Sequence, residues 1–338
     1  MAVTRRELAA AALGAALLPA AARAQTGAAK KARIGVLQTT GAGPMYIARD
    51  KGHFAREGID AEIIPFDAAQ PLAVSIAAGD LDFGATSLSA GFFNLAAQGL
   101  VRIVAAQGRD QAGFPNNGLV ASNDAWDKGL RDFGDIKGHR VGLPTQGSAP
   151  HYCAGLLAEK YGFPMSSMDL LFVKTNPNMV AAIVTNQVEA AIMPSTFALA
   201  LVANKGARLV GWIGDVTPWQ LGAAYTSTKH ADKDGDYVNA FLRGYRAGMR
   251  DYSDAFISPD GKRLDGPTAP EMLEIVARGV DQPVEVVRKG ITYVDREARL
   301  EGRDVRHQIG WHKAQGLVEG SVDVDALLDG RYVKLLPE

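Results

Sequence analysis

Short apolar runs alternate with segments of helical spacing along most of the chain. Runs such as "VRIVAA" at 101–106 have the length of buried strands, and the segments between such runs place apolar residues three and four positions apart. Steady alternation of strand and helix predicts mostly parallel sheets covered by helices on both faces. We expect strands at 33–38, 59–66, 81–85, 101–106, 118–122, 139–144, 169–174, 189–194, 207–213 and 223–227, and helices that begin at Pro44, Ser148 and Asn178 or cover 70–78, 88–98, 125–134, 195–204 and 237–256.

Two segments rich in Pro, Gly and Asn interrupt this alternation. They are "FPNNG" at 114–118 and "GDVTPWQLG" at 214–222, and a complete run of strands and helices lies between them. This order predicts an α/β protein of two lobes, in which the chain leaves the first lobe, builds the second and returns, with both crossings acting as hinges. The expected division is 31–117 for the first part of lobe I, 118–222 for lobe II, and 223–338 for the return to lobe I and the C-terminal helices.

The first 24 residues have the pattern of an export signal. Arg5 and Arg6 precede an apolar run, and the small-residue sequence "ARA" follows at 22–24. The apolar run is shorter than the roughly 20 residues that a membrane-spanning helix needs. We therefore expect residues 1–24 to be a cleavable, twin-arginine-like signal peptide and the remaining protein to be periplasmic. A permanent N-terminal anchor is the alternative.

Composition and motifs exclude several classes of function. With 36 Lys and Arg against 37 Asp and Glu, the formal charge is −1, which offers a nucleic acid no net attraction. The single cysteine, Cys153, excludes an intramolecular disulfide and is expected in the core. His307 and His312 are five residues apart, on different faces of a helix, which disfavours a zinc pair, and no G-x-S-x-G motif is present. We therefore expect no metal, cofactor, catalytic site or nucleic-acid partner, and we expect the protein to be a monomer.

A glycine-spaced loop, "GLPTQGSAPHY" at 142–152, lies between an expected strand and an expected helix. Its glycine spacing is that of a phosphate-binding loop, but such a loop requires Lys and then Ser or Thr after the second glycine. Here Ser148 and Ala149 follow Gly147, so the sequence disfavours a nucleotide. The free N–H groups at the start of a helix favour another kind of anion instead.

A second strand-to-helix loop, "GATS" at 84–87, carries similar small and hydroxyl-bearing residues. Ligands of open α/β sheets bind beyond the carboxyl ends of the strands, so these loops should share one cleft if two lobes face each other. The alternative is that Gly and Ser serve only as turn and cap residues and that the aromatic residues pack the hinges. The candidate loops are 38–46, 84–88, 144–152 and 193–197, with the anionic head group between Thr86, Ser87, Gly147 and Ser148, a further contact at His151, and Tyr46, Phe114 or Trp219 over the tail of the ligand.

Four blocks of sequence, in this order, resemble one family. They are "GAGPMYIARDKGHFAREGIDAEI", "IAAGDLDFGATSLS", "IKGHRVGLPTQGSAPHY" and "VEAAIMPSTFA", and the resemblance runs from about residue 32 to 225. It is to the periplasmic solute-binding proteins of ABC importers in the sulfonate, taurine and nitrate group, also called the NMT1/THI5-like family. It implies a two-lobed periplasmic-binding-protein fold of type II that closes over one small molecule.

The resemblance also implies site residues, block by block. The fourth block lacks the tryptophan-rich form that relatives carry, which leaves the shape of the ligand open. The cysteine-rich motif of the pyrimidine synthase branch is absent, which disfavours an enzyme. The implied contacts are Gly43, Pro44 and Met45 in the first block; Thr86 and Ser87 in the second; Gly147, Ser148 and His151 in the third; and Ser195 and Thr196 in the fourth. We add Thr40 and Tyr46 of the same first loop to the candidate ligand contacts.

These inferences predict a protein that captures a small organic anion, a sulfonate or carboxylate, and delivers it to the permease of an ABC importer. Two alternatives stay open. One is a binding protein of the same fold for a pyrimidine, another heteroaromatic molecule or a neutral ligand. The other is a secreted enzyme of the same fold.

Overall fold

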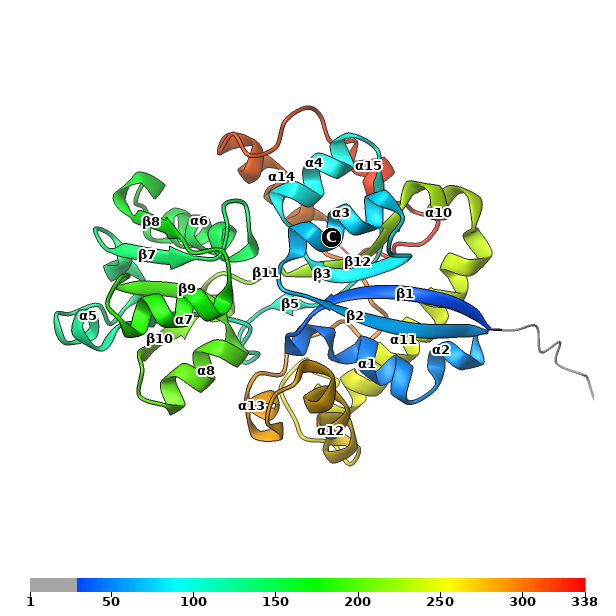
Figure 1. Cartoon of the computed structure of the whole chain (residues 1–338), viewed down its shortest axis with the longest axis horizontal. Coiled ribbons are helices and arrows are strands. Elements are labelled where there is room, and N and C mark those ends of the chain that lie inside the picture. The colour runs from blue at the N-terminus through cyan, green and yellow to red at the C-terminus, as the bar shows by residue number, and fades with distance from the viewer. Residues whose placement is uncertain (1–28, 338) are drawn as a thin grey trace, which may run out of the picture.

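The computed structural model describes residues 29–337, which fold into two five-stranded sheets covered by helices on both faces (Figure 1). The predicted signal peptide, residues 1–24, lies outside the described residues. A short two-stranded ribbon lies between the two sheets. Within residues 29–337, no helix is both long and apolar enough to cross a membrane. The predicted α/β fold with two sheet units is confirmed.

The first sheet has four strands in one direction and one reversed. Its order is β2-β1-β3-β12-β4, in which β1 is parallel to β2 and β3, whereas β12 is antiparallel to β3 and β4. The strands expected at 59–66 and 101–106 have these bounds in the structure. The five strands are β1 Lys30–Leu37, β2 Ile59–Phe66, β3 Phe83–Ser87, β4 Val101–Ala106 and β12 Gly222–Ser227.

Two apolar clusters hold helices against the two faces of this sheet. On one face, Leu72 covers two paired glycines: a Cβ at Gly35 would approach Leu72 Cγ to 2.8 Å, and a Cβ at Gly84 would approach Leu72 Cδ2 to 2.5 Å. Glycine in both strands therefore lets the helix pack close to the sheet. One cluster joins α1 Gly43–Asp50, α2 His53–Arg56, α11 Gly235–Phe256, α12 Ala269–Val280 and α13 Val284–Lys289; the other joins α3 Ala69–Ala78, α4 Ala90–Ala97, α14 Gly302–Ala314 and α15 Val324–Leu327, and α10 Thr228–Lys233 follows β12.

The second sheet has the same plan with order β10-β6-β9-β7-β8. Strand β6 is antiparallel to β9 and β10, and β7 is parallel to β8 and β9. The helix expected over 125–134 is shorter than predicted, because the chain turns after α5 and resumes as a 3-10 turn at Phe133–Ile136. The elements are β6 Asn117–Ala121, α5 Asn123–Asp127, β7 Arg140–Leu143, α6 Ala149–Tyr161, β8 Asp169–Phe172, α7 Asn176–Val184, β9 Ala190–Pro194, α8 Ser195–Ala203, β10 Arg208–Trp212 and α9 Ile213–Val216.

The chain crosses between the sheets at the two predicted breaks. Strand β5 (Arg109–Asp110) in the first crossing pairs antiparallel with β11 (Trp219–Gln220) in the second. The second break is thus more ordered than predicted, since it contains both α9 and β11. We propose that lobe II comprises residues 118–222 and that this ribbon is the hinge.

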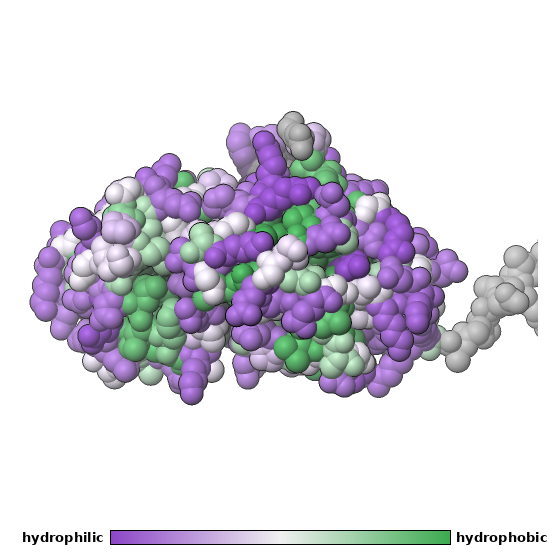
Figure 2. Space-filling view, turned by 90° about the horizontal axis from the view of Figure 1, so that it is seen from above, coloured by the Kyte–Doolittle hydropathy of each residue, from purple (hydrophilic) through white to green (hydrophobic). Residues whose placement is uncertain are grey.

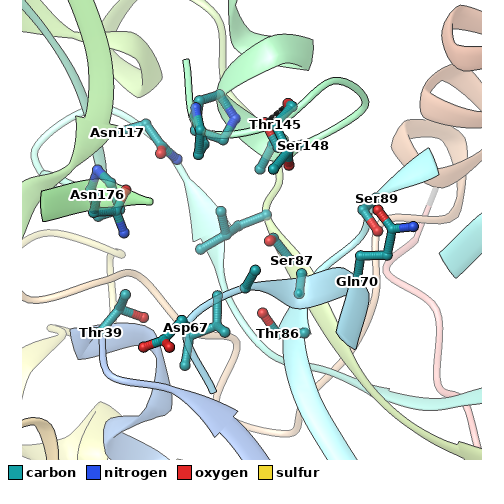
Figure 3. Close-up of a pocket in the computed structure, with 18 of the residues that line it drawn as sticks. Thr39, Asp67, Gln70, Thr86, Ser87, Ser89, Asn117, Thr145, Ser148 and Asn176 are labelled. Atoms are coloured by element: carbon teal, nitrogen blue, oxygen red, sulfur yellow. Dashed lines mark hydrogen bonds between the residues drawn. The ribbon is translucent and has the colours of Figure 1, made fainter. Parts of the chain in front are cut away.

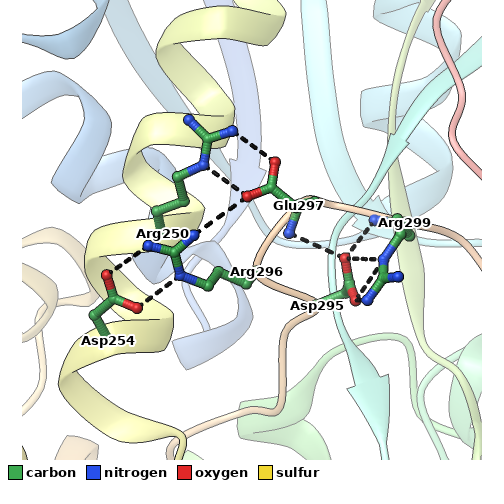
Figure 4. Close-up of polar contacts among 6 residues, drawn as sticks. All are labelled: Arg250, Asp254, Asp295, Arg296, Glu297 and Arg299. Carbon is green, nitrogen blue, oxygen red and sulfur yellow. Dashed lines mark hydrogen bonds and ion pairs between the residues drawn. The ribbon is translucent and has the colours of Figure 1, made fainter. Parts of the chain in front are cut away.

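The segment after α13 returns across the first unit and is tied to α11 by ion pairs (Figure 4). Arg250 binds Glu297 through two hydrogen bonds of 2.8 and 2.6 Å, and Arg296 binds Asp254 through two of 2.8 and 2.9 Å. Such two-point pairs fix geometry better than single contacts do. The same segment begins at Gly290, whose carbonyl oxygen accepts from Thr40 Oγ1 at 2.6 Å.

Polar side chains cover most of the surface seen from above, with apolar surface in separate patches on both units (Figure 2). The larger exposed apolar side chains belong to different elements, as is usual for a globular surface. They are Val74, Leu100, Tyr161, Phe172, Val184 and Leu335.

Candidate functional site

A cavity of about 90 Å³ lies between the two sheet units (Figure 3). A cavity needs roughly 10 to 15 Å³ of such volume to hold one water molecule, so this cavity has room for about six to nine water-sized groups. Loops from both units and both crossings form its wall. The lining residues are Leu37, Thr39, Asp67, Ala68, Ala69, Gln70, Thr86, Ser87, Ser89, Gln107, Asn116, Asn117, Pro144, Thr145, Gln146, Gly147, Ser148, Ala149, Pro150, Lys174, Asn176, Pro194 and Leu221.

Four helices begin at this wall: α3 and α4 from the first unit, α6 and α7 from the second. Ser89 caps α4 by accepting from Phe92 N at 3.2 Å, and Ser148 caps α6 by accepting from His151 N at 3.4 Å. The first turn of each helix still carries N–H groups without partners inside the helix. Together with the helix dipoles, these groups give the wall a positive partial charge from two directions.

Several buried polar atoms of the wall lack partners within residues 29–337. They are Thr86 Oγ1, Gln107 Oε1, Asn116 Nδ2 and Asn176 Oδ1. The amide of Gln107 has a fixed orientation, because its Nε2 donates to Gly41 O at 3.1 Å and Ala85 O at 3.3 Å. Buried polar groups are normally paired, so these atoms are suited to a bound molecule.

The loop before α6 is held by its own hydrogen bonds. Gly147 N donates to His151 Nδ1 at 3.0 Å, and Ser148 Oγ donates to Thr145 O at 2.7 Å. Burial lowers the pKa of His151 to about 4, so the imidazole is neutral at pH 7 and Nδ1 serves as the acceptor. His151 therefore shapes the loop from behind.

Of the fourteen site residues predicted from sequence, the structure brings Thr86, Ser87, Gly147 and Ser148 to the cavity wall. The helix after β3 starts later than expected: residues 84–87 belong to the strand, and the cap is Ser89. The two predicted head-group loops nevertheless line one cavity.

The first-loop contacts need correction, because Gly43, Pro44, Met45 and Tyr46 lie buried in α1, away from the cavity. A Cβ at Gly43 would meet Tyr252 Cε2 at 2.7 Å, and the ring of Tyr46 lies under Gly279. These residues pack α1 against α11 and α12. Thr40 is also turned away from the cavity, toward Gly290.

Five more predicted contacts lie outside the wall: Phe114, His151, Ser195, Thr196 and Trp219. Phe114 packs edge-on against Tyr293, and Trp219 packs edge-on against Tyr152, each with ring centroids 5.3 Å apart. Ser195 N donates to Asn116 O at 2.6 Å, and a Cβ at Gly290 would lie 2.8 Å from Ser195 Oγ. The structure therefore places Tyr46, Phe114 and Trp219, the predicted aromatic cover of the ligand, outside the wall of this cavity.

The sequence analysis did not include two loops of the cavity wall, or the residues of the two crossings that reach the cavity. Asp67 and Gln70 follow β2, and Lys174 and Asn176 follow β8. The same carboxyl-end rule, applied to those strands, finds both loops. Gln107, Asn116 and Asn117 at the crossings are also wall residues that the predicted loops do not include, whereas Thr39 lies within the predicted loop 38–46.

Asp110 connects the ribbon to the cavity. Its side chain is fully buried, and its Oδ2 accepts from Asn117 N at 3.3 Å and Asn117 Nδ2 at 3.1 Å. Burial raises the pKa of Asp110 to about 7, and the hydrogen bonds from Asn117 only partly oppose that shift. Because Nδ2 is engaged with Asp110, the carbonyl oxygen is the free end of the Asn117 side chain.

Metal-ligating side chains do not gather in the described part of the chain: residues 29–337 contain no group of three or more His, Cys, Asp or Glu placed to hold an ion. Among the described cavity residues, the ionisable side chains are Asp67 and Lys174. Both lie exposed to solvent.

Comparison with known proteins gives a family and partial relatives. The sequence model described as NMT1/THI5 like matches residues 39–259, more than half of the chain. A putative binding protein of Brucella abortus is 29% identical over 146 residues, which cover 43% of this chain and 41% of that protein. A 4-amino-5-hydroxymethyl-2-methylpyrimidine phosphate synthase of Schizosaccharomyces pombe is 28% identical over 149 residues, which cover 44% of this chain and 40% of that protein. The match thus spans about two fifths of the length of these relatives.

Solved structures share the whole fold. The alkanesulfonate-binding protein of Xanthomonas axonopodis pv. citri, bound to MOPS, has a TM-score of 0.68 and 18% identity over 88% of this chain and 97% of that chain. The periplasmic nitrate-binding protein of Synechocystis has a TM-score of 0.67 and 16% identity over 89% of this chain and 85% of that chain. At these identities the likeness shows the fold, which is that of the periplasmic binding proteins.

Proposed function

The chain belongs to the NMT1/THI5-like family, and on that premise we propose that it is an extracytoplasmic solute-binding protein of an ABC importer. In this proposal it captures a small organic anion, a sulfonate or carboxylate, between its two units and delivers it to the permease. In the same proposal the protein is periplasmic, which the predicted signal peptide supports, and it acts as a monomer. The names of the alkanesulfonate-binding and nitrate-binding structural relatives support this proposal.

One observation carries the proposal: the starts of α3, α4, α6 and α7 converge on a cavity between the two units whose wall has unpartnered buried polar atoms. Each helix start attracts an anion by about 0.3 to 1 kcal/mol, and four of them act on one small volume. A sulfonate or carboxylate head accepts hydrogen bonds from several N–H and O–H groups at once.

The composition of the wall argues against the two alternatives. The described cavity residues include two ionisable side chains, Asp67 and Lys174, which form no ion pair or hydrogen bond with each other or with a hydroxyl group of the wall, so no activated nucleophile is in place there. They also include no Phe, Trp or Tyr, so no aromatic ring stacks on a pyrimidine there. We therefore place this chain with the binding proteins and apart from the synthase of Schizosaccharomyces pombe.

Substitution of the α6 cap tests the proposal. Ser148→Asp keeps a capping oxygen, because Asp is as good an N-cap as Ser, but it puts a negative charge at the cavity wall. The matched control is Ser166→Asp, the same change at an exposed position of the same unit. We expect Ser148→Asp to abolish binding of sulfonates and carboxylates in calorimetry, while both variants unfold at similar urea concentrations. Binding of these anions by Ser148→Asp with wild-type affinity contradicts the assignment of the head-group site.

A further inference from the structure

Helix α14, in the C-terminal part of the chain, contributes to the cores of both units. It lies against α4 of the first unit and α6 of the second (Figure 1). Val305 and Ile309 belong to the apolar cluster of the first unit that also holds α3 and α4, whereas Trp311 belongs to the core of the second unit. The NMT1/THI5 like model matches residues 39–259, so α14 lies outside the matched segment.

Polar contacts fix α14 to the ribbon and to α6. The side chain of Gln308 is fully buried, and its Nε2 donates to Gln220 O in β11 at 2.8 Å. The hydroxyl group of Tyr152 in α6 lies 2.6 Å from Nδ1 of His307 in α14. The position of α14 relative to α6 is therefore set by contacts at the side chains of neighbouring residues, 307 and 308.

The indole ring of Trp311 fills a space on α6 that a glycine leaves open. A Cβ at Gly155 would lie 2.5 Å from Trp311 Cζ2, so a larger residue at 155 would displace the ring. Beside this contact a groove of about 460 Å³ lies between the two helices, and its wall includes Ala158, Phe163, Met165 and Ala314. Apolar packing between α14 and α6 is therefore concentrated at Trp311.

The same indole ring supports His151 behind the cavity loop. The two rings pack edge to face, with centroids 5.2 Å apart and planes at 80°, and Phe172 packs edge-on against His151 at 5.3 Å. The imidazole is 4% exposed and lies outside the cavity wall. Because a ring packed against two others has little freedom to rotate, its Nδ1 stays directed at Gly147 N, from which it accepts.

This hydrogen bond determines which N–H group the start of α6 offers to an anion. Gly147 N is engaged with His151, and Ser148 N donates to Thr145 O at 3.2 Å. Pro150 has no N–H group. The backbone N–H of Ala149, a residue of the cavity wall, is therefore the donor that remains for a ligand in this turn.

We propose that Trp311 is a positioning residue for anion binding. It holds the ring of His151, and His151 holds the turn at Gly147 so that the N–H of Ala149 is presented to the ligand. This inference rests on the proposed function and assigns α14 a part in it. Neither aromatic ring touches the ligand, and a shift of α14 reaches the cavity only through His151.

Two substitutions of His151 test its part in the proposal. His151→Leu removes the acceptor, whereas His151→Asn keeps one, because the side-chain carbonyl oxygen of Asn also accepts from backbone N–H groups. In His151→Leu, hydrogen exchange at the N–H of residue 147 in the ligand-free protein should be about ten-fold faster or more. The affinity for ethanesulfonate and propanoate in calorimetry should fall by about ten-fold. His151→Asn should restore both quantities to near their wild-type values.

Substitution of Trp311 tests the step before His151. Trp311→Ala should speed exchange at residue 147 and lower the affinity by about three-fold or more. In a His151→Leu background it should cause no additional loss of affinity, because two residues that act in one chain of contacts are not additive. The matched control is Trp126→Ala in α5, which packs against the core of the same unit at the end of β6 that lies away from the cavity. It should lower stability to urea without changing exchange at residue 147 or affinity.

The outcomes separate this inference from the proposed function. Unchanged exchange at residue 147 in Trp311→Ala, or additional loss of affinity in the double variant, overturns the role of Trp311 while anion binding stands. Equally weak binding by His151→Asn and His151→Leu overturns the role of the His151 acceptor. If neither probe binds the wild-type protein, the proposed function is contradicted, and exchange at residue 147 still decides whether Trp311 holds the turn.

Discussion

The backbone N–H of Ala90 donates to the carbonyl oxygen of Gly147 at 2.9 Å. Ala90 begins α4 of the first unit, and Gly147 lies just before α6 of the second, so this hydrogen bond joins the two units at the cavity wall. The contact requires glycine at 147 for two reasons. Its φ is +72°, and a Cβ there would lie 2.5 Å from Ala90 Cβ. The two units are therefore in direct backbone contact at the cavity wall in this structure.

Gly147→Ala should weaken ligand binding by ten-fold or more, because the added methyl group keeps Ala90 and residue 147 apart. The control is Gly162→Ala at the end of α6, where φ is +69° and a Cβ meets nothing within 4 Å. Both variants carry the cost of a left-handed alanine, about 1 to 2 kcal/mol, and should lose similar stability to urea. Only Gly147→Ala should lose affinity, measured by calorimetry, for a sulfonate or carboxylate that the wild type binds.

A second substitution tests the steric cause. Ala90→Gly removes the methyl group that an alanine at 147 would meet, and it leaves the N–H donor in place. The double variant should therefore regain most of the lost affinity. If it binds as weakly as Gly147→Ala alone, the contact between the units is not what the alanine disturbs.

The buried carboxyl group of Asp110 should make stability fall as pH rises. Its folded-state pKa of about 7 lies above the usual 3.8, so the folded protein binds more protons than the unfolded chain between about pH 4 and pH 7. The contribution to stability is fully present below pH 4 and is lost as pH rises to 7, at up to about 1.4 kcal/mol per pH unit. Asp110→Asn removes this loss. Its free energy of unfolding relative to wild type should therefore improve by up to about 3 kcal/mol between pH 5 and pH 8.

Urea unfolding at both pH values measures this change, with Asp80→Asn in an exposed turn as the matched control. The difference between Asp80→Asn and wild type should be the same at pH 5 and pH 8. A pH-independent difference for Asp110→Asn would show that the buried carboxyl group does not titrate in this range.

The buried ring of His312 should have the opposite effect on stability, which it should make rise as pH rises. Its ring is fully buried against Phe93 and Tyr152, and neither ring nitrogen has a partner within residues 29–337. Burial, and then the nearby His151, lower the pKa of His312 to about 4. The unfolded chain therefore binds more protons between pH 4 and 6.5, and the contribution to stability is lost as pH falls through that window.

His312→Phe keeps an aromatic ring and removes the titrating group. We expect the rise in unfolding free energy between pH 4.5 and pH 6.5 to be smaller in this variant than in wild type, by about 1 kcal/mol or more per pH unit. Chemical unfolding at three pH values in this window measures it. His151 is left intact and supplies the remaining slope, so an unchanged slope would assign the whole dependence to His151.

The sequence predicts the positions of strands and helix caps better than it predicts the direction in which a side chain points. Strands at 59–66 and 101–106 were recognisable because each is a bounded apolar run, and Ser148 was recognisable because a helix cap follows local rules. Neither signal reports which side of a helix faces a partner. His151 is on the correct helix, yet its ring turns back to Gly147 N. That direction depends on packing between distant segments.

The crossings were the least predictable part of the site. Gln107 and Asn117 reach the cavity because two segments more than 90 residues apart pair as a ribbon between the sheets. Their amides are oriented by Gly41, Ala85 and Asp110, none of which forms a local pattern with them. Local propensity carries no information about such contacts.

Gly43 is a residue at which the family resemblance and the structure suggest different roles, and substitution can distinguish them. The resemblance implied a ligand contact at this residue, whereas the structure buries it under Tyr252 and Val276, which a Cβ would approach to 2.7 and 3.0 Å. Tyr252 cannot easily move away, because its hydroxyl group donates to Thr292 O at 3.2 Å and accepts from Thr292 N at 3.0 Å. Gly43→Ala should therefore destabilise the protein by about 1 to 3 kcal/mol through overpacking.

The affinity of Gly43→Ala for a sulfonate or carboxylate that the wild type binds should equal that of wild type at a temperature where both are folded, because residue 43 lies outside the cavity wall. Gly310→Ala in the exposed side of α14 is the control: a Cβ there meets nothing within 4 Å, and alanine should stabilise the helix by up to about 1 kcal/mol. Urea unfolding and calorimetry together give both quantities. If Gly43→Ala lost affinity but kept wild-type stability, the result would support a direct ligand contact at residue 43, because overpacking alone should lower the free energy of unfolding.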